Sequence, residues 1–316
     1  MINTRAFWTV GAGRGEIRPA TLPEPGLEEL LIRSLASGVS RGTEALVFAG
    51  RVPPGQYDAM RAPLMDGTFP FPVKYGYSVV GERMDGGRVF VLHPHQERFL
   101  APRSMCIPIP AAIPTRRAVL AANMETALNI CWDAAPLAGE RMLVIGAGVV
   151  GLLTASLLAR VPAAEVTVVD INPARAALAE SFGCEFVLPD AAPADQELII
   201  HASASEAGLR LALDRAVFEG RIIEASWYGD QAPLVPLGEF FHARRLRLIA
   251  SQVGSIAPPM RGRRGHAERL ATALALLDDA AYDALLEGPT RFDDLPDAMP
   301  GILAPGGLCH VITYET

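Results

Sequence analysis

The feature of this sequence that most constrains its fold is a glycine-rich turn, Gly146–Gly151, which stands between an apolar segment and a helix-forming one. The apolar segment, 141–145, is typical of a strand buried on both faces of a parallel sheet. The segment after the turn, 149–160, is predicted to be a helix. Glycines at the first, third and sixth positions of a strand–turn–helix unit favour a turn that binds the phosphates of a nucleotide. The alternative is a tight turn without a ligand.

Each residue of this turn has its own predicted role. Gly146 would form the tight turn, Gly148 would let the backbone approach a pyrophosphate, and Gly151 would let the helix pack closely on the strand. The pyrophosphate would then lie on the free N–H groups at the start of the helix, Val149 and Val150, where the helix dipole is positive. The turn therefore predicts a dinucleotide site.

An acidic residue, Asp170, ends the next predicted strand, 165–170. A carboxylate there accepts hydrogen bonds from the adenosine ribose and repels a 2′-phosphate, so it favours NAD over NADP. We expect Ile171 and Arg175 to contact the same end of the cofactor. Arg175 would weaken the preference for NAD if it faced the ribose, and its alternative is a surface position on a helix.

The pattern of the sequence changes near residue 118. The part before it is rich in Pro and Gly, with short apolar runs that predict a β-rich unit without helices. A helix is predicted over 118–132, and strands then alternate with helices. This alternation predicts an α/β fold with a doubly wound parallel sheet. The remaining strands are expected at 198–201, 221–225 and 246–253, with a helix at 267–277 and a last strand at 308–314.

Charge and cysteine usage exclude several kinds of partner. The net charge of -7 argues against nucleic acid and anionic membranes, because both require a basic face. The start of the chain lacks a basic segment followed by an apolar one, and no apolar run is long enough to cross a membrane. The four cysteines are scattered, which is typical of reduced thiols in a cytoplasmic protein.

Four stretches of the sequence resemble the medium-chain dehydrogenase/reductase superfamily. They are Ser37–Glu44, Val73–Glu82, Val144–Gly151 and Val169–Arg175. The first two are most similar to the subgroup that contains the bacteriochlorophyllide hydroxyethyl dehydrogenase. The resemblance covers nearly the whole chain. It implies a GroES-like β-rich catalytic domain, residues 1–124 completed by 255–316, and a Rossmann NAD-binding domain, residues 125–254.

The sequence departs from the zinc-dependent members of that family at all three catalytic ligand positions. The resemblance places the first ligand at Ser40 and the second in Gly76–Ser78, which contains Tyr77. The third ligand falls near Ala122 or Asn123. Zinc binds thiolate, imidazole or carboxylate groups, and these side chains do not replace them. The four closely spaced cysteines of the structural zinc lobe are missing too, so we predict that no zinc is bound.

Two further histidines, His93 and His95, form a His-x-His pair. Two imidazoles alone do not make a metal site, and the sequence offers no third ligand. We expect both residues at the end of a strand beside the substrate site, or on the surface.

Without zinc, hydrogen-bond donors must stabilise the substrate oxygen. Tyr77 is the first candidate for proton donor, with Ser40 or Lys74 assisting, and Glu125 is a candidate base or substrate ligand. Each has a structural alternative. Ser40 would bond only its own loop, Tyr77 would be a buried aromatic bonded to a carbonyl, Lys74 would face solvent, and Glu125 would pair along its helix.

The resemblance implies further contacts to the cofactor. The residues it points to are Arg41, Thr126, Ser203, Ala204, Ser226 and Val253. It also implies a homodimer, because in the family the strand that corresponds to 246–253 pairs across a two-fold axis. An unpaired strand at the edge of a sheet must in any case be protected from pairing with strands of other molecules.

The leading hypothesis is a zinc-independent, NAD(H)-dependent oxidoreductase that interconverts a secondary alcohol and a carbonyl compound. The first alternative is a reductase of quinones or conjugated double bonds that uses NADPH, against which Asp170 argues. The second is a nucleotide-binding protein without catalytic activity, because all three zinc ligands are absent. In each case the expected partner is a small molecule.

Overall fold

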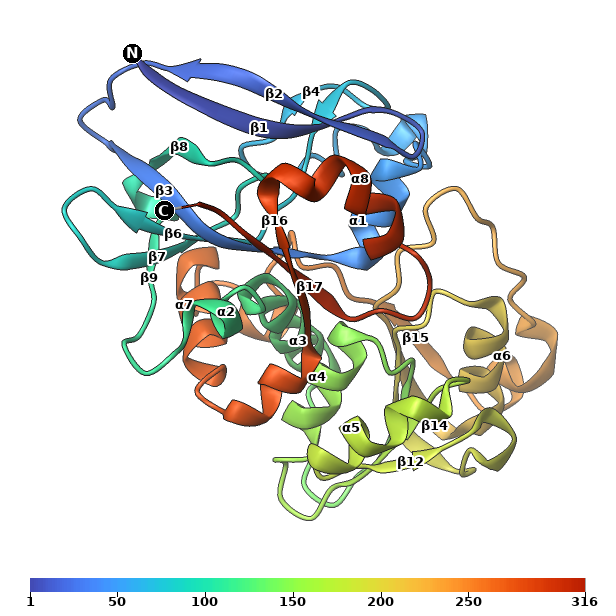
Figure 1. Ribbon diagram of the computed structural model, residues 1–316. Helices are drawn as coiled ribbons and strands as arrows, with labels where there is room; N and C mark the ends of the chain where they lie inside the picture. Colours follow the sequence, from blue (N-terminus) through green and yellow to red (C-terminus); the bar gives the residue numbers. More distant parts are fainter. Residues whose placement is uncertain (316) are drawn as a thin grey trace. The chain divides into compact units, whose positions relative to one another are not determined.

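A computed structural model describes residues 1–315 of the chain (Figure 1). Contacts between residues divide the chain into two units. Unit 1 comprises Met1–Ala122 and Leu270–Thr316, and unit 2 comprises Asn123–Arg269. Unit 1 is thus built from both ends of the chain, whereas unit 2 is one continuous segment. No helix within residues 1–315 is both long and apolar enough to span a membrane.

Unit 2 contains a six-stranded parallel sheet with the strand order β12-β11-β10-β13-β14-β15. The direction of the strand order reverses between β10 and β13, and in such sheets ligands bind at the carboxyl ends of the two strands at the reversal. The strands are β10 (Arg141–Ile145), β11 (Glu165–Val169), β12 (Glu185–Val187), β13 (Gln196–His201), β14 (Ala216–Glu224) and β15 (Arg247–Ala250).

Apolar side chains of this sheet form the core of unit 2. Leu143, Ile199 and Ile222 come from three adjacent strands and are fully buried. They pack against Ala212 and Leu213 of a helix that follows β13. The helices are α3 (Ala121–Ala134), α4 (Val149–Leu158), α5 (Ala176–Ser181), α6 (Glu206–Arg215) and the first residues of α7 (His266–Leu276), which continues into unit 1 from Leu270. The predicted doubly wound parallel sheet is therefore confirmed.

The sequence missed some local features of unit 2. It did not indicate β12, whose short segment carries no apolar alternation. The single helix predicted over 118–132 is broken, because α2 (Thr115–Ala118) ends before α3 begins. The last strand of the sheet, β15, is also shorter than the predicted 246–253.

Unit 1 contains two sheets. The smaller has the order β2-β1-β5-β4, and the larger has the order β16-β17-β3-β6-β7-β9, with β8 also paired to β3. The strands are β1 (Ile2–Gly11), β2 (Arg14–Leu22), β3 (Glu29–Val39), β4 (Asp66–Gly67), β5 (Val73–Lys74), β6 (Val79–Arg83), β7 (Arg88–Val91), β8 (Arg98–Pro102), β9 (Ile107–Pro108), β16 (Leu286–Arg291) and β17 (Cys309–Thr313). In Figure 1 the red strand β17 runs beside the blue strand β3, with which it pairs antiparallel. The predicted β-rich character of this unit is confirmed.

The prediction that unit 1 has no helix before residue 118 was wrong. Helix α1 (Arg41–Phe48) follows β3 directly, and α8 (Leu295–Ile302) lies near the end of the chain. The start of α1 is stabilised by Glu44, whose carboxylate accepts a hydrogen bond from the Ser40 N–H over 2.7 Å. An acidic residue in the first turn of a helix is a start signal that periodicity alone does not reveal.

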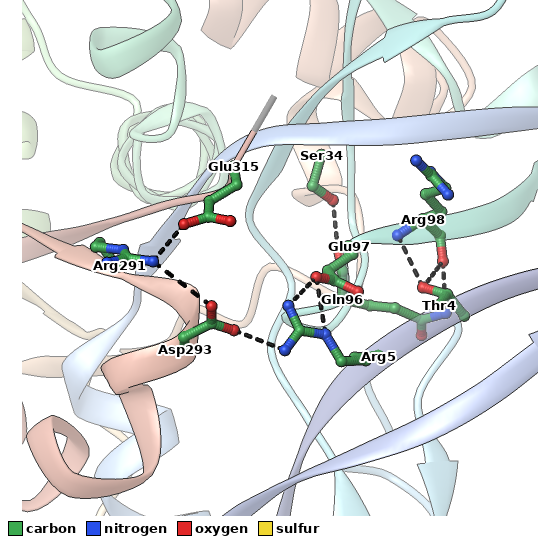
Figure 2. Close-up of polar contacts among 9 residues, drawn as sticks. All are labelled: Thr4, Arg5, Ser34, Gln96, Glu97, Arg98, Arg291, Asp293 and Glu315. Carbon is green, nitrogen blue, oxygen red and sulfur yellow. Dashed lines mark hydrogen bonds and ion pairs between the residues drawn. The ribbon is translucent and has the colours of Figure 1, made fainter.

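Charged side chains connect the two ends of the chain within unit 1 (Figure 2). Arg5 of β1 pairs with Glu97 over 2.5 Å and with Asp293 over 2.8 Å. Arg291 pairs with Asp293 over 3.7 Å and also with Glu315. Because these groups are partly exposed, each pair contributes little to stability, and together they fix the position of the C-terminal segment against β1.

Candidate functional site

The glycine-rich turn of unit 2 has a backbone that only glycine allows at two positions. Gly146 has a φ of +110°, and a Cβ there would lie 2.9 Å from the backbone of Ala202 and Ser203. A Cβ on Gly151 would lie 1.9 Å from the Gly146 carbonyl oxygen. Gly148 is different, because nothing lies within 4 Å of its would-be Cβ. The protein itself leaves this space open, as a site for a phosphate requires.

Helix α4 starts at this turn, and Gly148 is its N-cap residue. Glycine has no side chain to accept hydrogen bonds from the first N–H groups of the helix, so those groups, including Val149 and Val150, face outward without a cap. Uncapped N–H groups and the positive end of the helix dipole are the elements of an anion site. The residues present therefore fit a pyrophosphate.

Asp170 lies at the carboxyl end of β11, beside the turn. Its Oδ2 accepts a hydrogen bond from the Ala147 N–H over 2.6 Å, and its Oδ1 accepts one from the Asn172 N–H over 2.8 Å. An ionised carboxylate has about four acceptor sites, so two remain for ribose hydroxyls. Next to it, Ile171 is 85% exposed, and Arg175 is half-buried in a short 3₁₀ turn.

The other predicted cofactor residues of unit 2 lie mainly after strands. Ser203 and Ala204 follow β13, Ser226 follows β14, and the Ala204 N–H donates to Ser226 Oγ over 3.0 Å. Thr126 lies in α3, and the Val253 carbonyl accepts a hydrogen bond from Arg269 over 2.5 Å. Their roles toward a cofactor stay predictions.

Tyr77 and Ser40, at two positions that the resemblance assigns to zinc ligands, are hydrogen-bonded to each other in unit 1. Tyr77 donates a hydrogen bond to Ser40 Oγ over 2.7 Å and also contacts the Thr43 side chain. Burial, and secondly the nearby charge of Glu44, raise the pKa of Tyr77 to about 12. The phenol therefore stays protonated at neutral pH and is available as a proton donor.

A buried polar chain that the sequence did not reveal lies behind this pair. Glu44 is 4% exposed, and its Oε2 accepts a hydrogen bond from His95 Nε2 over 3.0 Å. His95 Nδ1 lies 2.7 Å from Ser37 Oγ, which lies 2.9 Å from the Tyr314 hydroxyl. The carboxylate is thus held within unit 1 by residues from β3, the segment after β7, and the C-terminus.

Of the two alternatives for His93 and His95, the surface position was wrong, because both residues are buried in the segment that follows the end of β7. Their exposed fractions are 3% and 0%, and His93 stacks on Phe99 with 3.7 Å between the ring centroids. Within residues 1–315, no group of three or more His, Cys, Asp or Glu side chains is placed to hold a metal ion.

The remaining catalytic candidates have other contacts. Lys74 donates to Gln96 Oε1 over 3.0 Å and lies 3.9 Å from Asp66, and burial lowers its pKa. It does not face solvent, and neither contact joins it to the Tyr77 hydroxyl. Arg41, a predicted cofactor residue, donates to the carbonyls of Ile302 and Ala304.

Glu125 pairs with a residue of a different helix rather than with one along its own. It forms an ion pair with Arg269 of α7 over 3.0 Å, and both side chains are at least 95% buried. Burial raises the pKa of Glu125, and the Arg269 charge opposes that effect. Arg269 also donates to Asn129 Oδ1 over 2.6 Å. These bonds occupy the Glu125 carboxylate within unit 2.

Sequence comparisons place parts of the chain among dehydrogenases. A family model for the C-terminal domain of alanine dehydrogenase/PNT matches residues 133–217. A zinc-type alcohol dehydrogenase-like protein of Haemophilus influenzae is 27% identical over 168 residues, 49% of this chain and 47% of that protein. The L-threonine 3-dehydrogenase of Rhizobium rhizogenes is 37% identical over 89 residues, 28% of this chain and 25% of that enzyme. The matched segment thus spans half or less of the length of these relatives.

Solved structures extend the likeness in fold to the whole chain. L-idonate 5-dehydrogenase of Escherichia coli has a TM-score of 0.79 at 14% identity, over 99% of this chain and 98% of that one. The 2R,3R-butanediol dehydrogenase of Bacillus subtilis has a TM-score of 0.78 at 16% identity, over 99% of this chain and 100% of that one. These likenesses show that the chain has the fold of these dehydrogenases, and the sequence matches to dehydrogenases cover parts of it.

Proposed function

We propose that this protein is an NAD(H)-dependent oxidoreductase that interconverts a secondary alcohol and a carbonyl compound without zinc. The observation that carries the proposal is the Tyr77–Ser40 hydroxyl pair, which stands where the resemblance places two zinc ligands. The open phosphate site at Gly148 in unit 2 supplies the second element.

The residues of the chain have separate parts in this reaction. When bound, NAD(H) supplies or accepts a hydride. Tyr77 donates a hydrogen bond and then a proton to the substrate oxygen. This donation takes the place of a Lewis acid. Ser40 accepts the Tyr77 hydrogen bond in the resting protein and orients the phenol. Because burial raises its pKa, Tyr77 carries its proton at neutral pH, where carbonyl reduction would use it.

The preference for NAD over NADP depends on Asp170. Two backbone N–H groups hold its carboxylate beside the turn, so its charge is fixed where it would repel a 2′-phosphate. In an Asp170→Asn variant the repulsion is removed, and we expect the ratio of NADP to NAD affinity to rise by about tenfold or more. Competition binding with both nucleotides measures this ratio.

Turnover assays separate the proposal from its alternatives. NADH and NADPH are each tested with a panel of ketones, aldehydes, quinones and enones, after removal of metals with a chelator. NADH-dependent reduction of ketones that survives chelation supports the proposal. NADPH-dependent reduction of quinones or enones alone would favour the first alternative, and nucleotide binding without turnover would favour the second. Stoichiometric zinc in the purified protein would contradict the zinc-free mechanism.

The edge strand β15 supports a homodimer as part of the proposal. Within the described sheet, β15 pairs with β14 along one edge only, and Leu248 on it is 38% exposed. An exposed strand edge is a template for pairing with a second copy. Sedimentation of the wild-type protein and of a Leu248→Glu variant tests this, because the dimer should dissociate in the variant.

A further inference from the structure

A histidine without a part in the proposed reaction lies fully buried at the carboxyl end of β13. His201 has an exposed fraction of 0%, and both of its ring nitrogens have partners. Nδ1 lies 2.7 Å from Glu224 Oε2, and Nε2 lies 2.7 Å from Ser203 Oγ. From the sequence, His201 was predicted only as the last residue of the strand at 198–201. A buried titratable group held at both ends is a candidate for function.

Glu224, at the end of β14, has hydrogen-bond partners on both carboxyl oxygens. Besides His201, its Oε2 accepts from the Tyr228 hydroxyl over 3.3 Å, and its Oε1 accepts from the Ser226 N–H over 2.9 Å. Burial and the Glu224 charge raise the pKa of Tyr228, so this phenol remains a neutral donor. Because the carboxylate only accepts, the Nδ1 of His201 carries a hydrogen in either protonation state.

Ser203 connects the imidazole to the nucleotide site. It is half-buried, and its hydroxyl also lies 2.8 Å from Ser205 Oγ, which accepts from the Gly208 N–H at the start of α6. The backbone of Ser203 lies against the glycine-rich turn, 2.9 Å from where a Cβ on Gly146 would be. Ser203 therefore lies between the buried imidazole and the start of α6, and its backbone lies beside the glycine-rich turn.

The protonation state of His201 decides which way the Ser203 hydroxyl points. With a neutral ring, Nε2 is an acceptor, so Ser203 must donate its hydrogen inward to the histidine. With a protonated ring, Nε2 donates to Ser203, and the hydroxyl hydrogen is released for another acceptor, either Ser205 Oγ at 2.8 Å or an oxygen of a bound nucleotide. A dinucleotide is anionic and rich in acceptor oxygens, so it favours the protonated form.

We propose that His201 is a positioning residue for the dinucleotide, and that it takes up one proton from solvent when the nucleotide binds so that Ser203 donates outward to the ligand. This inference rests on the proposed function, because it needs a dinucleotide in unit 2. The titratable groups that face the imidazole are the Glu224 carboxylate on β14 and the phenol of Tyr228, whose hydroxyl lies 3.4 Å from His201 Nδ1.

Calorimetry of NADH binding in two buffers with different ionisation enthalpies counts the protons taken up. We expect net uptake in the wild-type protein, and an affinity that decreases with rising pH by up to about tenfold per pH unit, the limit for one linked proton. In His201→Gln, which keeps a polar side chain that does not titrate, both effects should disappear. The matched control is His242→Gln, which removes an exposed histidine of the same unit and should keep both.

A second variant keeps the imidazole and disturbs the Ser203 hydroxyl. A Cβ on Gly208 would lie 2.4 Å from Ser203 Oγ and 2.7 Å from His201 Nε2, so Gly208→Ala should abolish the proton uptake. Proton uptake that is equal in wild type and His201→Gln would overturn this inference and leave the proposed function intact. Absence of NADH binding at every pH would overturn both.

Discussion

The two proposed sites of this protein are built in opposite ways. The nucleotide site of unit 2 consists mainly of backbone, and its determining residues, Gly146–Gly151 and Asp170, lie close together in the chain. The hydroxyl site of unit 1 consists of side chains, from Ser37 to Tyr314, that only the folded structure brings together. A site made of backbone should tolerate substitution of most of its side chains, but not a Cβ added to one of its glycines. A site made of side chains should lose function when any one of its hydrogen-bonded residues is replaced.

The two sites also differ in charge. The turn of unit 2 presents uncapped N–H groups and a carboxylate that is fixed by backbone donors. In unit 1, a buried carboxylate and imidazole lie behind the hydroxyls, and burial together with the Glu44 charge raises the pKa of Tyr77. The first arrangement suits an anionic ligand, and the second keeps a proton on a phenol. Substitutions in unit 2 should therefore change nucleotide affinity, and substitutions in unit 1 should change the rate of the reaction on the substrate.

The largest effect is expected from Tyr77→Phe. Loss of the proton donor should lower kcat by about a hundredfold to ten-thousandfold, while the NADH affinity of unit 2 stays unchanged. The matched control is Tyr75→Phe, whose hydroxyl donates to the Met60 carbonyl over 3.3 Å and not to Ser40. Equal losses of kcat in the two variants, or a parallel loss of NADH affinity, would contradict the separation of the two sites.

The next largest effect is expected in the glycine-rich turn. Gly148→Ala places a methyl group in space that the protein leaves empty, so it should lower NADH affinity by about a hundredfold or more with unchanged thermal stability. Gly151→Ala instead forces its Cβ to within 1.9 Å of the Gly146 oxygen, and should lower both affinity and melting temperature. Calorimetry and thermal unfolding measure the two quantities. A Gly148→Ala protein that binds NADH normally would show that no phosphate lies there.

A smaller effect concerns the pH dependence of stability in unit 1. Burial lowers the pKa of His93 from its ordinary 6.5 to about 3, so the unfolded chain binds a proton that the folded protein does not. The contribution of neutral His93 to the free energy of unfolding is therefore complete above pH 6.5. It is lost as the pH falls toward 3, by about 1.4 kcal/mol per pH unit. In His93→Gln the slope of the free energy of unfolding against pH should be less steep by that amount. The control is His266→Gln, an exposed histidine, and an equal slope in His93→Gln and wild type would contradict the assignment.

The smallest effect is expected at a helix start in unit 2. Asn172 accepts a hydrogen bond from the Ala174 N–H over 3.1 Å, at the start of the turn that leads into α5. Asn172→Ala should lower the free energy of unfolding by about 1 kcal/mol, whereas Asn172→Ser should restore most of it. Urea unfolding measures both. Because Asp170 holds its own position through backbone donors, we expect NADH affinity to change little in either variant.

The parts of the fold that the sequence predicted are those fixed by local chemistry. The strand at 141–145 and the turn that follows it depend on residues close together in the chain, and the structure contains both. Strand β12 and helix α1 were missed because each is short and carries no clear apolar period. The start of α1 depends on Glu44, and a single acidic residue is a weak signal in a sequence.

The candidate sites follow the same rule. Tyr77 was predicted as the proton donor with Ser40 or Lys74 assisting, and the structure joins its hydroxyl to Ser40 Oγ over 2.7 Å. Glu44, His95 and His201 were not selected, because a buried titratable residue is recognised only from its neighbours, and these come from distant segments. For the His-x-His pair at 93–95 a strand end and the surface both stayed open, since a sequence carries no direct measure of burial for a histidine.

The position of β17 has a consequence for how the protein is made. This strand lies between β16 and β3 within the larger sheet of unit 1, so the sheet lacks an inner strand until residues 309–313 have left the ribosome. Unit 2 has no such dependence, because its sheet ends at β15. During synthesis unit 2 can therefore fold before unit 1 is complete. Until β17 is synthesised, the first 122 residues lack one strand of their sheet and stay accessible to chaperones and proteases.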